Sequence, residues 1–161
     1  MSPGALLPAF AALTATLLPV TAPDPAETAP CPEHALVLHA SRVPSSPSVV
    51  RVEVTNRGGR ACSVAPFPTV TFQDLDGSAQ PVPAQPAGRY RLAPGATARA
   101  TVRTIADPAD PEARRTGALA VAADPAHRGR AFTAARLGGG DTIRVWEPVT
   151  SRWRPSQDVE R

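Results

Sequence analysis

A stretch of strictly alternating residues in the first half of this chain constrains its fold more than any other feature. Val50, Val52 and Val54 alternate with polar residues, which is the period of a strand buried on one face only. The next residues, Asn56–Gly59, tolerate the positive φ angles that a chain reversal needs. The stretch therefore predicts a strand, a tight polar turn and a second strand that carries Cys62.

The rest of the chain continues this pattern and predicts an all-β fold. Short alternating segments are separated by turn signals at intervals of about 8–12 residues, as in a β-sandwich. The chain has 20 prolines, and an interior proline costs a helix about 3 kcal/mol, so a helical bundle is not expected. We predict a single immunoglobulin-like β-sandwich of about seven or eight strands over residues 31–149. The side chains expected in its core are Leu36, Leu38, Val50, Val52, Val54, Val70, Phe72, Leu92, Val102, Leu119, Val121, Ile143 and Val145.

The two ends of the chain differ from this domain. Residues 1–22 are apolar and uncharged, and Pro8 and Pro19 interrupt a run too short to span a membrane comfortably. A signal peptide over residues 1–22 is the favoured interpretation, and an uncleaved anchor is the alternative. Residues 23–30 are predicted to be a disordered spacer, and residues 150–161 a polar C-terminal tail. We expect no transmembrane span in the mature chain.

The only two cysteines are Cys31 and Cys62. In an exported protein such a pair indicates a disulfide, which here closes a loop of about 30 residues and contributes roughly 3–4 kcal/mol by chain entropy. Two buried free thiols are the alternative. A redox-active pair is disfavoured because the spacing is far from Cys-x-x-Cys.

Several of these elements together resemble a known family. Their order is Cys31, Asn56-Arg57-Gly58, Ala61-Cys62, Phe67-Pro68, Asp76-Gly77 and Leu92-x-Pro94-Gly95. This order resembles the actinobacterial secreted domain of unknown function 4232. The resemblance implies export or lipid anchoring, a single immunoglobulin-like sandwich and no established activity. Members commonly carry a second cysteine pair in the C-terminal half, which this chain lacks.

No residue set forms a catalytic or cofactor signature. His34 and His39 fall on opposite faces of a strand, so surface or capping roles are favoured over a metal site. Asp74 and Asp76 beside Gly77 indicate a turn rather than a calcium loop. A nucleophile elbow of the Gly-x-Ser-x-Gly type is absent from the sequence. We therefore expect no enzyme activity, no cofactor and no metal.

A basic and aromatic cluster near the C-terminus is the one candidate for binding. Such a cluster contacts anionic polymers by charge and stacking, although one packed tryptophan and a solvated tail are the simpler interpretation. Its members are Arg144, Trp146, Arg152, Trp153 and Arg154.

These observations predict a non-enzymatic binding or structural module that is secreted or held in the cell envelope. Its ligand is unknown, with an envelope polymer or an extracellular protein as the expected partner class, nucleic acid excluded and a monomer expected. The net charge of +3 is small, and all 17 basic residues are arginine, a bias typical of a GC-rich coding sequence. The alternatives are a secreted enzyme inhibitor that presents the Pro-rich loop Gln80–Gly88, and an unrecognised hydrolase.

Overall fold

The structure is a computed structural model, and it describes residues 1, 28–84 and 88–156. The described residues form fourteen strands and one short 3₁₀-helix, without an α-helix, so the predicted all-β class is confirmed. The elements are η1 (Glu33–Ala35), β1 (Leu36–Val43), β2 (Ser46–Asn56), β3 (Cys62–Val64), β4 (Thr69–Phe72), β5 (Leu75–Ser78), β6 (Gln80–Val82), β7 (Tyr90–Leu92), β8 (Thr97–Arg103), β9 (Arg114–Thr116), β10 (Ala118–Ala122), β11 (Arg130–Thr133), β12 (Ile143–Val145), β13 (Val149–Ser151) and β14 (Arg154–Pro155).

The larger sheet is built around β2, the strand that the valine alternation predicts. Its order is β1-β2-β8-β13-β6, and β14 pairs with the other end of β8. β2 runs antiparallel to both β1 and β8, and Val52 lies between Ala40 on one side and Ala100 on the other. Because β2 is a central strand, its register sets which face of three strands points to the core.

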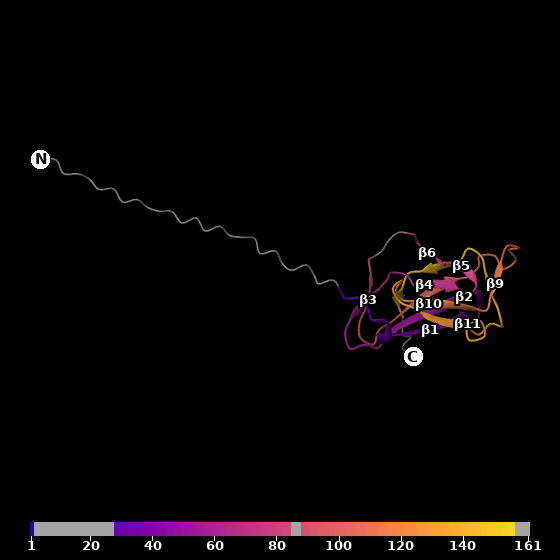
Figure 1. Ribbon diagram of the computed structural model, residues 1–161, viewed down its shortest axis with the longest axis horizontal. Helices are drawn as coiled ribbons and strands as arrows, with labels where there is room; N and C mark the ends of the chain where they lie inside the picture. Colours follow the sequence, from indigo (N-terminus) through magenta and orange to yellow (C-terminus); the bar gives the residue numbers. More distant parts are fainter. Residues whose placement is uncertain (2–27, 85–87, 157–161) are drawn as a thin grey trace.

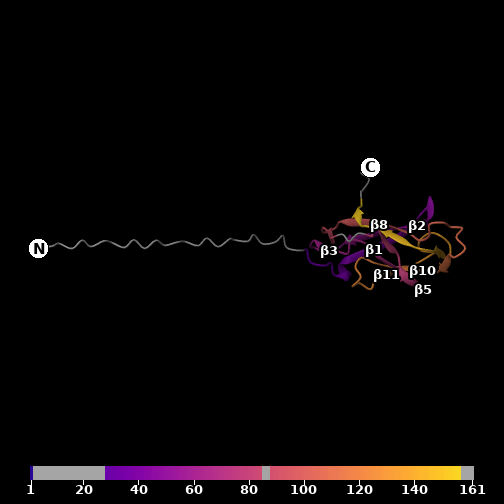
Figure 2. The same ribbon diagram turned by 90° about the horizontal axis from the view of Figure 1, so that it is seen from above.

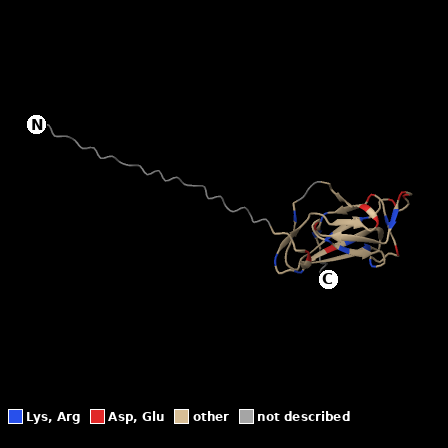
Figure 3. Ribbon diagram, in the orientation of Figure 1, with Lys and Arg blue, Asp and Glu red and all other residues tan. Residues whose placement is uncertain are grey.

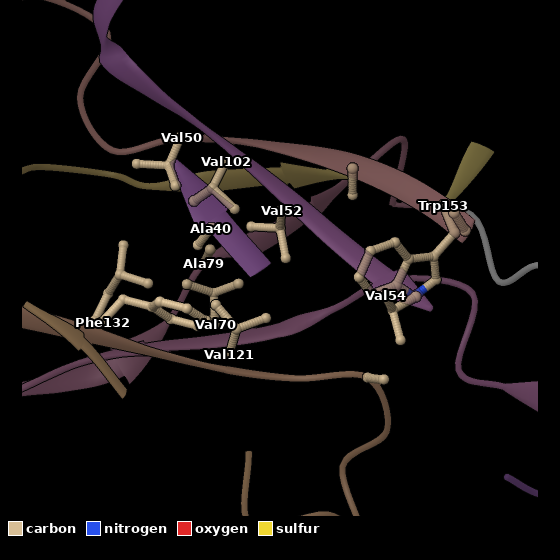
Figure 4. Close-up of a cluster of buried hydrophobic side chains, with 14 of the residues drawn as sticks. Ala40, Val50, Val52, Val54, Val70, Ala79, Val102, Val121, Phe132 and Trp153 are labelled. Carbon is tan, nitrogen blue, oxygen red and sulfur yellow. The ribbon is translucent and has the colours of Figure 1, made fainter. Parts of the chain in front are cut away.

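A second sheet of order β11-β10-β4-β5 covers the inner face of the first. Figure 2 shows β2 and β8 on one side of the molecule and β5, β10 and β11 on the other. Valines of β2 and β8 point toward Val70, Val121 and Phe132 across the core (Figure 4). Two short pairs, β3–β7 and β12–β9, lie at opposite ends of the molecule (Figure 1).

The core contains the residues that alternation predicted, with two differences. Eleven of the thirteen predicted side chains are buried, whereas Leu36 and Leu38 are only partly buried and pack against the cluster. The cluster also includes Trp153, which the sequence placed in the tail. The number of strands exceeds the seven or eight expected, because segments of two to four residues that resemble loops in sequence, such as β9 and β14, pair with a neighbour.

Asn56 joins two of the predicted turns to each other. Its side chain is fully buried, donates to the carbonyls of Arg60 (2.8 Å) and Leu92 (3.2 Å) and accepts the N–H of Gly58 (2.9 Å). Its backbone bonds to Gly95 and Ala96 of the second turn. The reversal after β2 and the turn before β8 are therefore one hydrogen-bonded unit.

Both predicted ends of the domain need correction. The predicted polar tail begins at residue 150, but β13 and β14 place residues 149–151 and 154–155 in the larger sheet. The predicted spacer ends at residue 30, but residues 28–30 bond to Ser63 of β3 through both its backbone and its hydroxyl. In both segments, hydrogen bonding to an exposed strand edge compensates for the low hydrophobicity that indicated disorder.

The predicted signal peptide and most of the spacer lie outside the described residues, which omit residues 2–27. Among the residues that the structure does describe, no helix is long and apolar enough to cross a membrane.

Candidate functional site

A two-stranded ribbon of β9 and β12 projects two arginines from one end of the molecule. In its antiparallel register, Arg115 lies directly opposite Arg144, and Ile143 lies opposite Thr116. Ile143, Val145 and Thr116 are buried, whereas Arg115 and Arg144 are exposed. Period-2 alternation therefore anchors one face of the ribbon in the core and turns both guanidinium groups outward. Figure 3 shows the resulting basic segment at β9.

Both arginines line a pocket of about 380 Å³, which we call the arginine pocket. A third arginine, Arg42 of β1, lines it as well, together with hydroxyl groups of Ser48, Thr104 and Thr142. None of the described residues that line this pocket is an aspartate or a glutamate. The full lining is Arg42, Pro47, Ser48, Thr104, Ile105, Pro108, Arg115, Thr142, Ile143 and Arg144.

Arg42 lines the pocket at the point where the pairing of β1 with β2 shifts register, between Arg42 and Val43. Its guanidinium donates from Nη1 to the carbonyl of Gly139 (2.8 Å) and lies 3.5 Å from the carbonyl of Thr142 through Nη2, while its Nε is buried without a partner in the described residues. These hydrogen bonds hold the cation in place without neutralising it. A fixed cation loses less conformational entropy when it binds an anion.

No ion pair within the described part of the chain involves an arginine of this pocket. The only ion pair in that part joins Arg89 and Asp124, beside β3 rather than beside this ribbon. Arg144 donates to a backbone carbonyl of Asp110, not to its carboxylate. Like charges directly opposite each other on paired strands are destabilising, and arginine does not lose its proton. Binding of an anion relieves this repulsion.

A second pocket, of about 480 Å³, borders the same ribbon at Arg114 and Val145 and is called here the Trp146 cleft. It combines the half-buried indole of Trp146 with polar and charged groups from two segments. The lining is Phe72, Leu75, Asp76, Gly77, Ser78, Gln80, Arg114, Val145, Trp146, Glu147 and Pro148. Glu147 has a φ of 46°, in the left-handed region that residues other than glycine rarely adopt.

The structure separates the five residues of the predicted polyanion cluster. Arg144 lines the arginine pocket and Trp146 lines the Trp146 cleft. Arg154 lies elsewhere. It pairs with Arg99, whereas Trp146 forms a β-bridge with Ile105, and in extended chain Arg99 and Ile105 are about 20 Å apart.

The predicted role of Trp153 in binding is wrong, because the side chain is 3% exposed and belongs to the core. Arg152 lies over the ring of Phe67, 5.6 Å from its centroid. The arginine pocket contains Arg42 and Arg115 instead, which the sequence analysis did not identify as binding residues. The adjacent pair Arg114-Arg115 is the one local signal, because two cations in a row rarely lie on a buried segment.

The opposite end of the molecule holds the disulfide and a structural cluster. Cys31 and Cys62 are bonded, as predicted, with Cα atoms 4.8 Å apart. The carbonyl of Cys31 lies 3.0 Å from Nε2 of His127. Hydrogen bonds from the backbone N–H groups of Gly129 and Arg128 lower the pKa of the neighbouring Glu33 carboxyl below its usual value, and the charge of His127 adds to this effect.

Arg89 ties three segments together at this end. It donates to the hydroxyl and the carbonyl of Ser63 and forms the ion pair with Asp124 at 2.7 Å. Burial raises the pKa of Asp124, but hydrogen bonds from Ala126 and Arg89, together with the charges of Arg89 and His127, outweigh burial and leave the pKa lowered. Burial raises the pKa of Tyr90. The contacts of Glu33, Asp124 and Arg89 therefore link several segments at this end of the molecule.

The structure describes part of the predicted Pro-rich loop. The Pro-rich loop predicted over Gln80–Gly88 begins with strand β6, which pairs in parallel with β13, and residues 85–87 of it lie outside the described residues. No group of three or more His, Cys, Asp or Glu side chains within the described residues is arranged to hold a metal ion.

Comparison with known proteins gives one match. The model of the family described as domain of unknown function (DUF4232) matches residues 31–152. No curated protein matches the chain, and no solved structure does. The match extends through β13 and includes both turns joined by Asn56, the disulfide and the β9–β12 ribbon. Since it covers well over half of the sequence, the chain belongs to the DUF4232 family.

Proposed function

We propose that this protein is an exported, non-enzymatic binding module of an actinobacterial cell envelope, and that its ligand is an anionic envelope polymer held at the arginine pocket. The observation that carries the proposal is the placement of three arginines around one pocket that no described carboxylate lines. A protein gains no stability from such an arrangement by itself, because the charges repel each other. An anionic ligand makes it favourable, and arginine is suited to carboxylate and phosphate groups through paired N–H donors.

Export and the finer fold class are parts of the same proposal. The disulfide supports an oxidising compartment, and the apolar uncharged start of the chain supports a leader. Two mainly antiparallel sheets packed face to face support an immunoglobulin-like sandwich. The arginine-only basic composition supports the GC-rich source.

The proposal is tested with protein recovered from an exporting host and incubated with washed envelope fractions. We expect retention at low ionic strength that declines as salt is added, since salt screens exposed charges beyond about 10 Å at 0.1 M. The double variant Arg115→Ala/Arg144→Ala should weaken retention, by roughly tenfold for each guanidinium group removed. The matched control is Arg57→Ala/Arg91→Ala, which removes the same charge from exposed positions outside the pocket.

Three results would overturn this proposal. The first is no retention by any fraction at low salt. The second is equal weakening by the control variant, because it would reduce the effect to net charge. The third is release of reducing sugars or soluble fragments from the fractions, which would make the protein a hydrolase.

A further inference from the structure

The two pockets at the β9–β12 ribbon are neighbours along both strands. Arg115 and Arg144 line the arginine pocket, while Arg114 and Trp146 line the Trp146 cleft. Arg144 and Trp146 are two residues apart, so in extended chain their Cα atoms are about 7 Å apart and both lie on one side of the strand. This separation is shorter than two units of a sugar chain, so one linear ligand can reach both pockets.

The two pockets differ in chemistry. The arginine pocket has three cations and hydroxyl groups. The Trp146 cleft has an aromatic ring, two carboxylates, Asp76 and Glu147, and one cation, Arg114. Its carboxylates repel a second anionic group, but they accept hydrogen bonds from hydroxyl groups. The cleft is therefore suited to an uncharged, hydroxyl-rich part of a ligand.

Trp146 is placed to present a fixed surface to such a ligand. Its backbone N–H donates to the carbonyl of Thr104 at 3.0 Å, and its neighbour Pro148 accepts the N–H of Gln80 at 2.8 Å. The indole is half-buried, so part of it stays accessible. The electron-rich face of an indole attracts the weakly positive C–H groups of a sugar ring, while the hydroxyl rim of the sugar meets the polar lining.

The backbone of Glu147 is a separate indication of a binding site. Its left-handed conformation, with φ of 46°, costs on the order of 1–2 kcal/mol for a residue with a Cβ atom. Residues held in such conformations cluster at ligand-binding sites, because the strained backbone holds a side chain in the geometry that binding needs. Here Glu147 and the residue before it, Trp146, both line the Trp146 cleft.

We propose that the Trp146 cleft is a sugar-binding subsite beside the arginine pocket, so that the ligand of this protein is an acidic polysaccharide. The inference rests on the proposed function, because the anionic groups of that polysaccharide occupy the arginine pocket. It goes beyond that function by excluding polyanions without sugar rings, such as polyphosphate, as full ligands. It also disfavours nucleic acid, whose phosphates would approach Asp76 and Glu147.

The test compares three soluble probes on the protein recovered from an exporting host: hyaluronate oligosaccharides, which are acidic, chitin oligosaccharides, which are neutral, and linear polyphosphate. Trp146→Ala should weaken hyaluronate binding by about tenfold and leave polyphosphate binding unchanged. Arg115→Ala/Arg144→Ala should weaken the binding of both anionic probes. Neutral chitin oligosaccharides should bind more weakly than hyaluronate and only in the presence of Trp146.

A second measurement uses the native indole, so that it does not depend on how well the alanine variant folds. The chain has two tryptophans, and Trp153 is buried, so Trp153→Phe leaves Trp146 as the only tryptophan whose emission is followed. Hyaluronate oligosaccharides should shift the emission of Trp146 to shorter wavelength, and polyphosphate should not. Unchanged emission with hyaluronate, or equal binding of hyaluronate by the Trp146→Ala variant, overturns the sugar subsite while the polyanion site stands. Binding of neither anionic probe, combined with no retention on envelope fractions, overturns the proposed function as well.

Discussion

Asn56 shows how one polar residue can organise a largely apolar fold. An asparagine amide has two donors and one acceptor oxygen, and here each finds a backbone partner in a different part of two turns. Because the side chain is fully buried, any group left without its partner loses hydration with no compensation. No aliphatic residue and no carboxylate meets the same requirement.

We predict that Asn56→Ala lowers the free energy of unfolding by about 3 kcal/mol, since it leaves two carbonyls and one N–H without partners. Asn56→Asp should be at least as harmful, because a carboxylate cannot donate to the carbonyls of Arg60 and Leu92. Urea unfolding measures both variants. Gln73→Ala, at an exposed position, is the control, and an equally small effect of all three changes would contradict this account.

The carboxyl of Asp124 should give the protein part of its acid sensitivity. Its pKa in the folded protein is lowered, so its contribution to stability is complete above the ordinary aspartate pKa of about 3.9. That contribution is lost as pH falls through the lower, folded-state pKa. Asp124→Asn keeps the shape of the side chain and removes the titration. We expect the variant to be less stable at pH 7 and the difference to shrink toward pH 2.

Thermal unfolding over this pH range, for the wild type and Asp124→Asn in parallel, measures the difference directly. Glu33 also has a lowered pKa, but it is present in both proteins and cancels in the comparison. A stability difference that does not vary with pH would show that the charge of Asp124 does not contribute to stability.

At the scale of elements, the C-terminal segment is the clearest departure from the sequence pattern. β13 and β14 pair with two different parts of β8, and Trp153 between them enters the core. The backbone N–H of Trp153 donates to the carbonyl of Pro66, which also ties this segment to the chain before β4. The segment therefore closes one edge of the larger sheet and one end of the core.

Trp153→Ala should consequently lower the free energy of unfolding by about 3–5 kcal/mol, as is usual when a large buried ring is removed. Trp153→Phe should cost less, because it retains most of the volume and removes an indole N–H that lacks a partner within the described residues. Chemical denaturation gives both values. Arg154→Ala, at an exposed neighbour, should change stability by less than about 0.5 kcal/mol. A silent Trp153→Ala would restore the polar-tail interpretation.

For the whole molecule, the disulfide joins the first residue of the family match to β3. It spans 31 positions, and in the chain-entropy model a loop of this length is worth about 3–4 kcal/mol. We expect reduction to lower the midpoint of urea unfolding, and Cys31→Ser/Cys62→Ser to make that midpoint insensitive to reductant. Intact mass after alkylation should show two modified thiols only when the exported protein is first reduced. Alkylation of both thiols without reduction would contradict the bond in the exported protein.

The sequence by itself determined the all-β class, the position of β2, most of the core and the cysteine pair. These follow from local rules, because period-2 alternation identifies one buried face, and the residues of turns act over a few positions. The sequence did not determine the boundaries of the domain, because hydrophobicity does not show that residues 28–30 and 154–155 pair with a distant strand edge. Nor did it determine the candidate site. Arg42 and Arg144 are far apart in the chain, and only the tertiary arrangement of β1 and the β9–β12 ribbon brings them to one pocket. Trp153 and Trp146 look alike in sequence, but one is in the core and the other lines a cleft, because the path of the backbone around β8 decides which side chain is covered.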